Sequence, residues 1–164
     1  MKALILYATK YGAAREIAEQ IAKMMNDAAI HDLKQNGIPD ITEFDCVIIG
    51  SSVYAGSIRK EAKTFVIKNA NLLRNKKLGL FISGIGESGE KKYFSDNFPQ
   101  DILQTAKTTS FLGGIFDPQK AGAIERFIIK IVTKQSGYLN TISKEKIKMF
   151  AEAMRGSITL DRNK

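Results

Sequence analysis

An apolar run near the N-terminus, followed at once by a glycine turn and a helical pattern, constrains this fold more than any other feature. Residues 2–8 (KALILYA) lack the polar alternation of a strand with one face in water, so they predict a strand buried on both faces, as in a parallel sheet. After a polar turn over residues 9–12, apolar side chains recur with helical period over residues 13–25. The chain therefore opens with a strand, a turn and a helix.

The same alternation continues to the end of the chain. Strands alternating with helices predict an α/β fold: a doubly wound, five-stranded parallel sheet with helices on both faces. Because no linker or repeat interrupts the pattern, we expect a single domain over residues 1–164. A proline is expected to bend or break one helix near Pro99. The further strands are predicted over residues 29–33, 46–50, 78–83 and 110–116, and the further helices over 59–73, 93–106, 123–135 and 143–155.

Composition excludes several classes of protein. The chain has one cysteine, Cys46, and one histidine, His31, so an internal disulfide cannot form and a Cys/His metal site is not expected. The N-terminus lacks the layout of a signal peptide, and no apolar run approaches the roughly 18 residues of a membrane span. We therefore expect a cytoplasmic protein.

The formal net charge is +8, and it is distributed unevenly along the chain. Residues 1–56 have 5 basic and 7 acidic side chains, whereas residues 57–116 and 117–164 each have 10 basic and 5 acidic ones. An attraction to phosphate, an acidic partner or anionic lipid therefore resides in the later two-thirds. Nucleic acid is not an expected partner, because basic and aromatic residues do not interleave in a recognised motif.

The loop after the first strand suits a phosphate. Ligands of open α/β sheets bind beyond the carboxyl ends of the strands, and this loop leads directly into a helix whose first N–H groups are unpaired. Thr9 adds a hydroxyl and Gly12 permits close approach of the backbone. The alternative is an ordinary strand-to-helix turn, which also favours a small polar residue and a glycine.

Two further loops carry features of a ligand site. Residues 50–57 (GSSVYAGS) are mostly small, so their amides can reach the edge of a planar ligand while Tyr54 offers a face for stacking; the alternative is a flexible turn with a core tyrosine. Residues 84–89 match GxGxxG, but a dinucleotide site also needs an acidic residue about 20 positions on, where the chain has Thr108 and Thr109. NAD(P) binding is therefore a minor alternative. No side chain stands out as an acid, base or nucleophile.

With these loops in place, the sequence resembles the flavodoxin family. The matching stretches are LILYATKYGAAREIAEQIA, FDCVIIGSSVYAG, LGLFISGIGES and SFLGGIF. The resemblance implies an FMN cofactor, with its phosphate in the first loop, its ring between the other two, and Tyr54 stacked on it. The implied cofactor-binding residues are Thr9, Lys10, Tyr11, Gly12, Ala13 and Ala14, then Ser51, Ser52, Val53, Tyr54, Ala55 and Gly56, then Ser83, Gly84, Ile85, Gly86 and Glu87.

Two departures from the family pattern bear on the site. Flavodoxins commonly have hydroxyl or amide side chains where this chain has Tyr11, Ala13 and Ala14, so fewer side-chain bonds to phosphate are expected. The loop over residues 84–89 lacks the aromatic residue that usually covers the second face of the flavin. One face of the ring is therefore expected to be open to a substrate or partner.

The later part of the chain is similar to a particular branch, the menaquinone-dependent protoporphyrinogen oxidases. The similarity lies in residues 113–118 (GGIFDP) and 124–137 (IERFIIKIVTKQSG), although the Asp-Trp pair common in that branch is missing. An extra amphipathic helix is expected at about residues 120–136, with a wide apolar arc and a basic side formed by Arg126, Lys130 and Lys134. Such a helix suits an anionic membrane surface on the inner face of the membrane, or a partner. The alternative is a core-packing helix.

These features favour an FMN-dependent oxidoreductase of the quinone-linked type. Its expected partners are a quinone or a redox protein. The competing function is a non-enzymatic flavodoxin that passes single electrons to a protein partner. In both, the flavin supplies the chemistry and the protein supplies position and potential.

Overall fold

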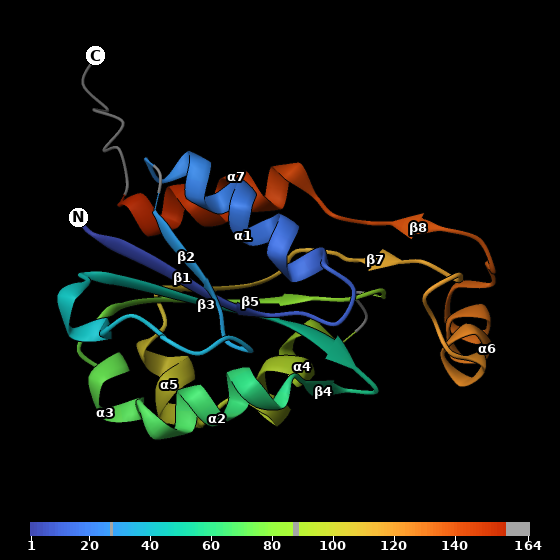
Figure 1. Cartoon of the computed structure of the whole chain (residues 1–164), viewed down its shortest axis with the longest axis horizontal. Coiled ribbons are helices and arrows are strands. Elements are labelled where there is room, and N and C mark those ends of the chain that lie inside the picture. The colour runs from blue at the N-terminus through green and yellow to red at the C-terminus, as the bar shows by residue number, and fades with distance from the viewer. Residues whose placement is uncertain (27, 87–88, 157–164) are drawn as a thin grey trace, which may run out of the picture.

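Five parallel strands form the central sheet of the computed structural model, which describes residues 1–26, 28–86 and 89–156 (Figure 1). Their order across the sheet is β2-β1-β3-β5-β6, so the winding reverses between β1 and β3. The short β4 (Ser57–Ile58) folds back antiparallel on the end of β3. The predicted doubly wound sheet is confirmed, with strands β1 (Ala3–Ala8), β2 (Ala29–Asp32), β3 (Cys46–Tyr54), β5 (Lys77–Ser83) and β6 (Thr108–Phe111).

Helices cover both faces of the sheet, because successive side chains of the central strands point to opposite faces and are apolar in both directions. In β1, Leu4 and Leu6 face one core while Ile5 and Tyr7 face the other. Figure 1 shows α1 (Ala13–Met24) and α7 (Lys144–Arg155) on one face. The opposite face is covered by α2 (Lys60–Lys68), α3 (Ala70–Leu73), α4 (Glu90–Asn97) and α5 (Gln100–Thr105).

Two predicted helices are each divided in the structure. The helix predicted over residues 59–73 is interrupted at Asn69, which ends α2 with its N–H bonded to the Phe65 carbonyl. The helix predicted over 93–106 starts earlier, at Glu90, and breaks at Pro99 as expected, where the proline stands just before α5. Cys46 is buried at the start of β3, where burial raises the pKa of its thiol to about 11, in keeping with a packing role.

The strand predicted over residues 110–116 is wrong as a single element. The chain leaves the sheet after β6, and Ile115–Phe116 form a separate strand, β7, that pairs antiparallel with β8 (Leu139–Asn140). Gly113 makes this turn possible: its φ is +81°, and a Cβ there would lie 1.9 Å from the Thr141 carbonyl oxygen. The backbone of Thr141 and Ile142 therefore lies too close for any side chain at position 113.

The β7–β8 ribbon carries α6 (Ala123–Thr133) beyond the carboxyl ends of the parallel strands (Figure 1). Backbone and hydroxyl bonds join the ribbon: the Thr141 N–H donates to the Gly114 carbonyl at 2.8 Å, and the Gly114 N–H donates to Thr141 Oγ1 at 3.0 Å. The Gly84 N–H donates to the Gly113 carbonyl at 3.1 Å, which ties the ribbon to the loop after β5. In the described part of the chain, α6 included, no helix is long and apolar enough to cross a membrane.

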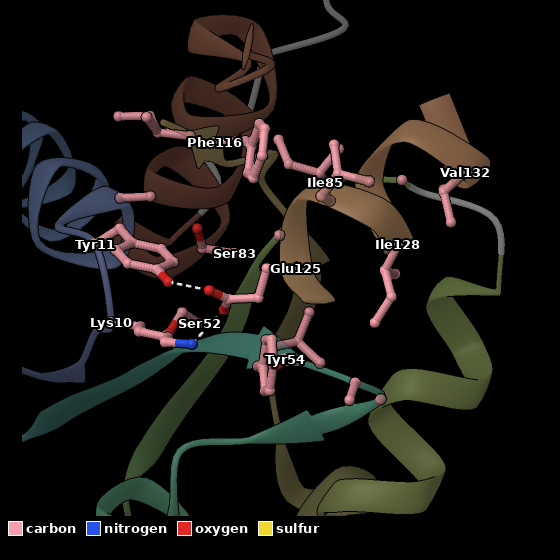
Figure 2. A pocket seen from close by; sticks show the side chains of 18 of the residues that line it. Lys10, Tyr11, Ser52, Tyr54, Ser83, Ile85, Phe116, Glu125, Ile128 and Val132 are labelled. Atoms are coloured by element: carbon pink, nitrogen blue, oxygen red, sulfur yellow. Dashed lines mark hydrogen bonds and ion pairs between the residues drawn. The ribbon is translucent and has the colours of Figure 1, made fainter. Parts of the chain in front are cut away.

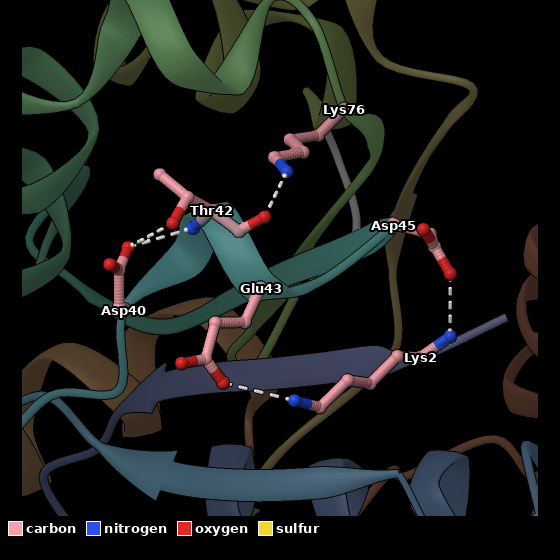
Figure 3. A network of polar contacts seen from close by, with 6 residues as sticks. All are labelled: Lys2, Asp40, Thr42, Glu43, Asp45 and Lys76. Atoms are coloured by element: carbon pink, nitrogen blue, oxygen red, sulfur yellow. Dashed lines mark hydrogen bonds and ion pairs between the residues drawn. The ribbon is translucent and has the colours of Figure 1, made fainter.

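A cluster of polar side chains lies at the opposite end of the sheet, where the parallel strands begin (Figure 3). Lys2 joins two segments there, with its N–H donating to Asp45 Oδ2 at 2.8 Å and its Nζ pairing with Glu43 Oε2 at 3.0 Å. Asp40 accepts bonds from the N–H and hydroxyl of Thr42, and these bonds lower the pKa of the Asp40 carboxyl. The cluster connects neighbouring segments of the fold at the edge remote from the pocket described below.

Candidate functional site

A pocket of about 290 Å³ lies beyond the carboxyl ends of β1, β3 and β5, with α6 as its outer wall (Figure 2). Residues from all three loops that the sequence analysis singled out, those after β1, β3 and β5, line it. The predicted residues that line it are Thr9, Lys10, Tyr11, Ala13, Ser52, Val53, Tyr54, Ala55, Gly56, Ser83, Gly84, Ile85 and Gly86. That they bind FMN remains a prediction.

Some predicted site residues lie elsewhere. The Ala14 side chain is buried in the core beneath α1, and Ser51 is fully buried below the pocket. The Ser51 hydroxyl accepts the Arg59 N–H at 2.9 Å and so supports the start of α2. Gly12 caps α1 without lining the pocket, and Glu87 lies outside the described residues.

The first loop has the geometry of an anion site. Gly12 is left-handed, with φ +95°, and its N–H donates to Thr9 Oγ1 at 3.0 Å, which makes a tight turn into α1. The first N–H groups of α1 have no carbonyl one turn earlier in the helix, so they are available to an acceptor. The Lys10 N–H donates to Ser52 Oγ at 3.1 Å, which joins this loop to the loop after β3.

The loop after β3 is a hairpin turn that presents Tyr54. Ala55 and Gly56 both have positive φ, as required in the two central positions of a tight turn between β3 and β4. Asn97, almost fully buried on α4, holds the turn in place: its Oδ1 accepts the Ile58 N–H and its Nδ2 donates to the Gly56 carbonyl, each at 2.9 Å. Tyr54 lines the pocket and is 39% exposed, so part of its side chain is accessible to a ligand.

Ser83 gives a polar atom at the deep end of the pocket. It ends β5, its side chain is fully buried, and its Oγ has no hydrogen-bond partner among the residues that the structure describes. A buried hydroxyl without a partner is costly, unless a ligand supplies the missing bond. Together with the small residues around it, this atom fits a ligand with polar groups along one edge.

Glu125 of α6 was missed by sequence reasoning, and it stands at the centre of the pocket's polar contacts (Figure 2). Its side chain is 10% exposed and bonds both Lys10 Nζ and, at 2.5 Å, the Tyr11 hydroxyl. The Gly122 N–H also donates to Glu125 Oε2, at 2.9 Å. Lys10 Nζ in turn lies 4.0 Å from the centre of the Tyr54 ring. We call Lys10, Tyr11, Tyr54 and Glu125 the Glu125 cluster.

The contacts of the Glu125 cluster shift its pKa values. Burial opposes the Glu125 carboxylate, but hydrogen bonds from Lys10, Tyr11 and Gly122 outweigh burial and lower its pKa. For Lys10, burial is likewise outweighed by bonds to Glu125 and Tyr11, so its pKa is raised. Burial and the bond to Glu125 raise the pKa of Tyr11. An ammonium, a neutral phenol and a carboxylate therefore coexist at neutral pH.

Three stripes run along α6, because the helix advances about 100° per residue. Glu125, Ile128, Ile129 and Val132 line the pocket, as do Ile115 and Phe116 of β7, and within this stripe Ile128 and Val132 are exposed by 40% and 58%. A second stripe faces solvent, with Ile124, Phe127 and Ile131 exposed by 72%, 65% and 63%. The third stripe is Arg126, Lys130 and Lys134, all exposed. The alternative of a core-packing helix is wrong, since Glu125 is the buried residue of α6.

The pocket-facing stripe of α6 and strand β7 are the other parts of the site missed by sequence reasoning, together with Tyr93 of α4. The apolar period of α6 gave a signal, but it was interpreted as one continuous arc. The signal that could have identified Glu125 is that it is the single acidic residue within this apolar and basic helix.

Comparison with known proteins agrees with this geometry. The family model for the flavodoxin domain matches residues 4–143, so the chain belongs to the flavodoxin domain family. This confirms the expected fold and cofactor: the chain is a flavodoxin-like FMN redox protein. A curated relative from Escherichia coli K12, protoporphyrinogen IX dehydrogenase [quinone], is 25% identical over 150 residues, covering 84% of this chain and 81% of the relative. That similarity supports the predicted branch.

Solved structures share the fold. Rubredoxin oxygen:oxidoreductase from Desulfovibrio gigas aligns over 93% of this chain with a TM-score of 0.60 and 16% identity, and the chain spans 35% of that protein. A Streptococcus pneumoniae flavodoxin aligns over 94% of this chain and 98% of its own, with a TM-score of 0.57 and 18% identity. Both show the same arrangement of strands and helices at low identity.

Proposed function

We propose that this member of the flavodoxin family is an FMN-dependent oxidoreductase of the quinone-linked type, which passes electrons between a reduced donor and a quinone. The observation that carries the proposal is the apolar wall that α6 and β7 add to the pocket, through Ile128, Ile129, Val132, Ile115 and Phe116. The name of the curated relatives, which includes both a dehydrogenated substrate and a quinone, supports the same reaction class.

The residues of the pocket fit FMN. The first loop and the start of α1 would hold the phosphate, Tyr54 would stack on the ring, and Ser83 Oγ would bond a polar edge of it. When bound, FMN accepts and donates electrons, singly or in pairs. The role of this chain is to bind and orient the cofactor and, through the α6 wall, to give one side of the pocket an apolar lining.

The apolar wall favours a large apolar electron partner. A quinone head group with an apolar tail matches a surface of isoleucine, valine and phenylalanine better than it matches water. A carrier that docks on another protein instead needs its flavin edge at an open surface. Here α6 stands over that opening, which supports a small-molecule partner.

The exposed stripes of α6 support a location at an anionic membrane surface, where quinones reside. Ile124, Phe127 and Ile131 would enter the interface while Arg126, Lys130 and Lys134 meet lipid phosphates. This arrangement would place the pocket-facing stripe of the same helix next to the lipid. Helix α6 thus supports both the quinone as partner and the anionic membrane surface as location.

The experiment that tests this function uses the FMN-loaded protein, reduced under anaerobic conditions. A quinone-linked enzyme is expected to be reduced in one two-electron step and to be reoxidised rapidly by a water-soluble menaquinone analogue. Two well-separated one-electron steps, with slow reoxidation by the quinone, would instead favour the carrier. Replacing Ile128 with Ser is expected to slow reoxidation by the quinone more than reoxidation by ferricyanide, a small polar oxidant.

A further inference from the structure

We propose that Glu125 is an internal competitor for the phosphate of FMN: its carboxylate takes the side-chain donors of the first loop and holds α6 across the pocket until the nucleotide displaces it. The proposal rests on the FMN site described above, and it concerns how that site is filled. It assigns a role to a residue that lies 115 positions from its lysine partner in the sequence.

The first argument is the supply of donors. Ala13 and Ala14 have no side-chain donor, and Thr9, whose Oγ1 accepts the Gly12 N–H, has only one short hydroxyl left to donate. The long donors that this loop sends into the pocket are therefore Lys10 and Tyr11, and both bond the Glu125 carboxylate. The Tyr11 phenol has a single O–H, so a phosphate that recruits it must take it from Glu125, and a phosphate that recruits Lys10 must share the ammonium with Glu125.

The second argument is charge. A phosphate monoester carries between about one and a half and two negative charges at neutral pH. Lys10 is the ammonium that neutralises Glu125, and it cannot equally neutralise a second anion beside it. Because the Glu125 side chain is only 10% exposed, solvent screens this repulsion weakly. The carboxylate and the phosphate therefore disfavour each other's presence in the pocket.

The third argument is space. The Lys10 ammonium lies over the Tyr54 ring, 4.0 Å from its centre, on the ring expected to stack on the flavin. As long as Glu125 holds Lys10 there, that ring face is covered. The flavin ring and the Lys10 ammonium held by Glu125 thus compete for the same face of Tyr54.

The attachment of α6 allows this exchange. The helix joins the body through the short β7–β8 ribbon, two residues in each strand, and Glu125 is its buried residue. Its outward apolar stripe packs on none of the core clusters. Releasing the one buried carboxylate of α6 therefore lets the helix shift on the β7–β8 ribbon, with its apolar side chains still beside the pocket, while the parallel sheet stays unchanged.

The test compares the affinities of FMN and riboflavin, which differ by the phosphate alone. In wild type and in Glu125→Gln, the dissociation constant of each flavin is measured by fluorescence quenching. The preference for FMN, taken as the riboflavin constant divided by the FMN constant, is expected to rise about 5- to 20-fold in the variant, near the lower end of typical coupling between sites. A preference that stays within twofold of wild type would overturn the proposal.

Controls separate this proposal from loss of fold and from failure of the proposed function. Glu43→Gln removes a Lys–Glu pair of the same kind at the far edge of the sheet (Figure 3) and is expected to leave the preference unchanged. Glu125→Ala is expected to reproduce the rise, with the far-ultraviolet circular dichroism of wild type. If neither wild type nor Glu125→Gln binds any flavin, the FMN function itself fails. If both bind FMN with the same preference, only the role of Glu125 fails.

Discussion

At the scale of single residues, the site is defined by what each loop lacks as much as by what it contains. Ala13 provides no hydroxyl for a phosphate, and the described part of the loop after β5 contributes no aromatic ring to the pocket. Lys10 and Tyr11 extend from the first loop instead, while Tyr54 provides an aromatic ring from the loop after β3. The chemistry of binding is therefore concentrated in the residues of the Glu125 cluster.

Replacing Tyr54 with Ala tests the stacking role. Loss of one aromatic stack is expected to weaken FMN binding about tenfold, which corresponds to about 1.4 kcal/mol. Riboflavin should weaken equally, because the ring and not the phosphate loses its contact. Tyr138→Ala, at a 60% exposed tyrosine that does not line the pocket, is the matched control. Full FMN affinity in Tyr54→Ala, measured by fluorescence quenching, would show that another group holds the ring.

The Glu125–Lys10 pair makes part of the stability depend on pH. The pKa of Glu125 is lowered from its ordinary value of 4.5, so its contribution is present above that value and is lost as pH falls through the lower, folded pKa. The pKa of Lys10 is raised from 10.5, so its contribution is present below that value and is lost as pH rises through the folded pKa.

Urea unfolding as a function of pH measures this dependence in the unliganded protein. Between about pH 5 and 10 the wild type should be more stable than Glu125→Gln by roughly 1 kcal/mol, the upper end for a partly exposed pair. That difference should shrink as pH falls below 4.5. If the difference in the free energy of unfolding stays constant down to pH 3, the charge of the Glu125 carboxylate does not contribute to stability.

At the scale of elements, the parallel sheet and its loops could be predicted because apolar period and glycine turns are local signals. The division of the last predicted strand was not predictable in that way. It depends on the close approach of Thr141 and Ile142 to Gly113, from which they are distant in the sequence. The role of α6 was missed for the same reason: its pattern reveals an apolar surface, but only the fold shows which residues face the pocket.

The outward face of α6 leads to a prediction about membranes. The protein is expected to sediment with anionic vesicles at low salt and less at high salt, because both apolar insertion and lipid phosphates contribute. Phe127→Ser should weaken binding by at least tenfold, as expected for the loss of one inserted aromatic side chain. Ile67→Ser, at a 57% exposed position on α2, is the control and should bind as wild type does. If the wild type is absent from the vesicle pellet at low salt as well as at high salt, a membrane role for α6 is contradicted.

At the scale of the whole molecule, the amino-terminal and carboxyl-terminal ends of the parallel strands have different roles. The amino edge is closed by the polar cluster of Lys2, Asp40, Thr42, Glu43 and Asp45 (Figure 3), whereas the carboxyl edge opens into the pocket. The net charge of +8 arises in the segments after residue 56, and three of those basic residues form one stripe of α6. We propose that this stripe meets an anionic surface, whereas the first loop contributes Lys10 to the pocket.

Titration of the purified, flavin-free protein with FMN tests the central claim most directly. We expect FMN fluorescence to be quenched to saturation at one FMN per chain, with a shifted visible flavin spectrum, because one pocket presents an anion loop and a stacking tyrosine to the same ligand. The same titration of Tyr54→Ala should saturate at the same stoichiometry with weaker affinity. Flavin fluorescence and absorbance that stay unchanged at every protein concentration would contradict the account.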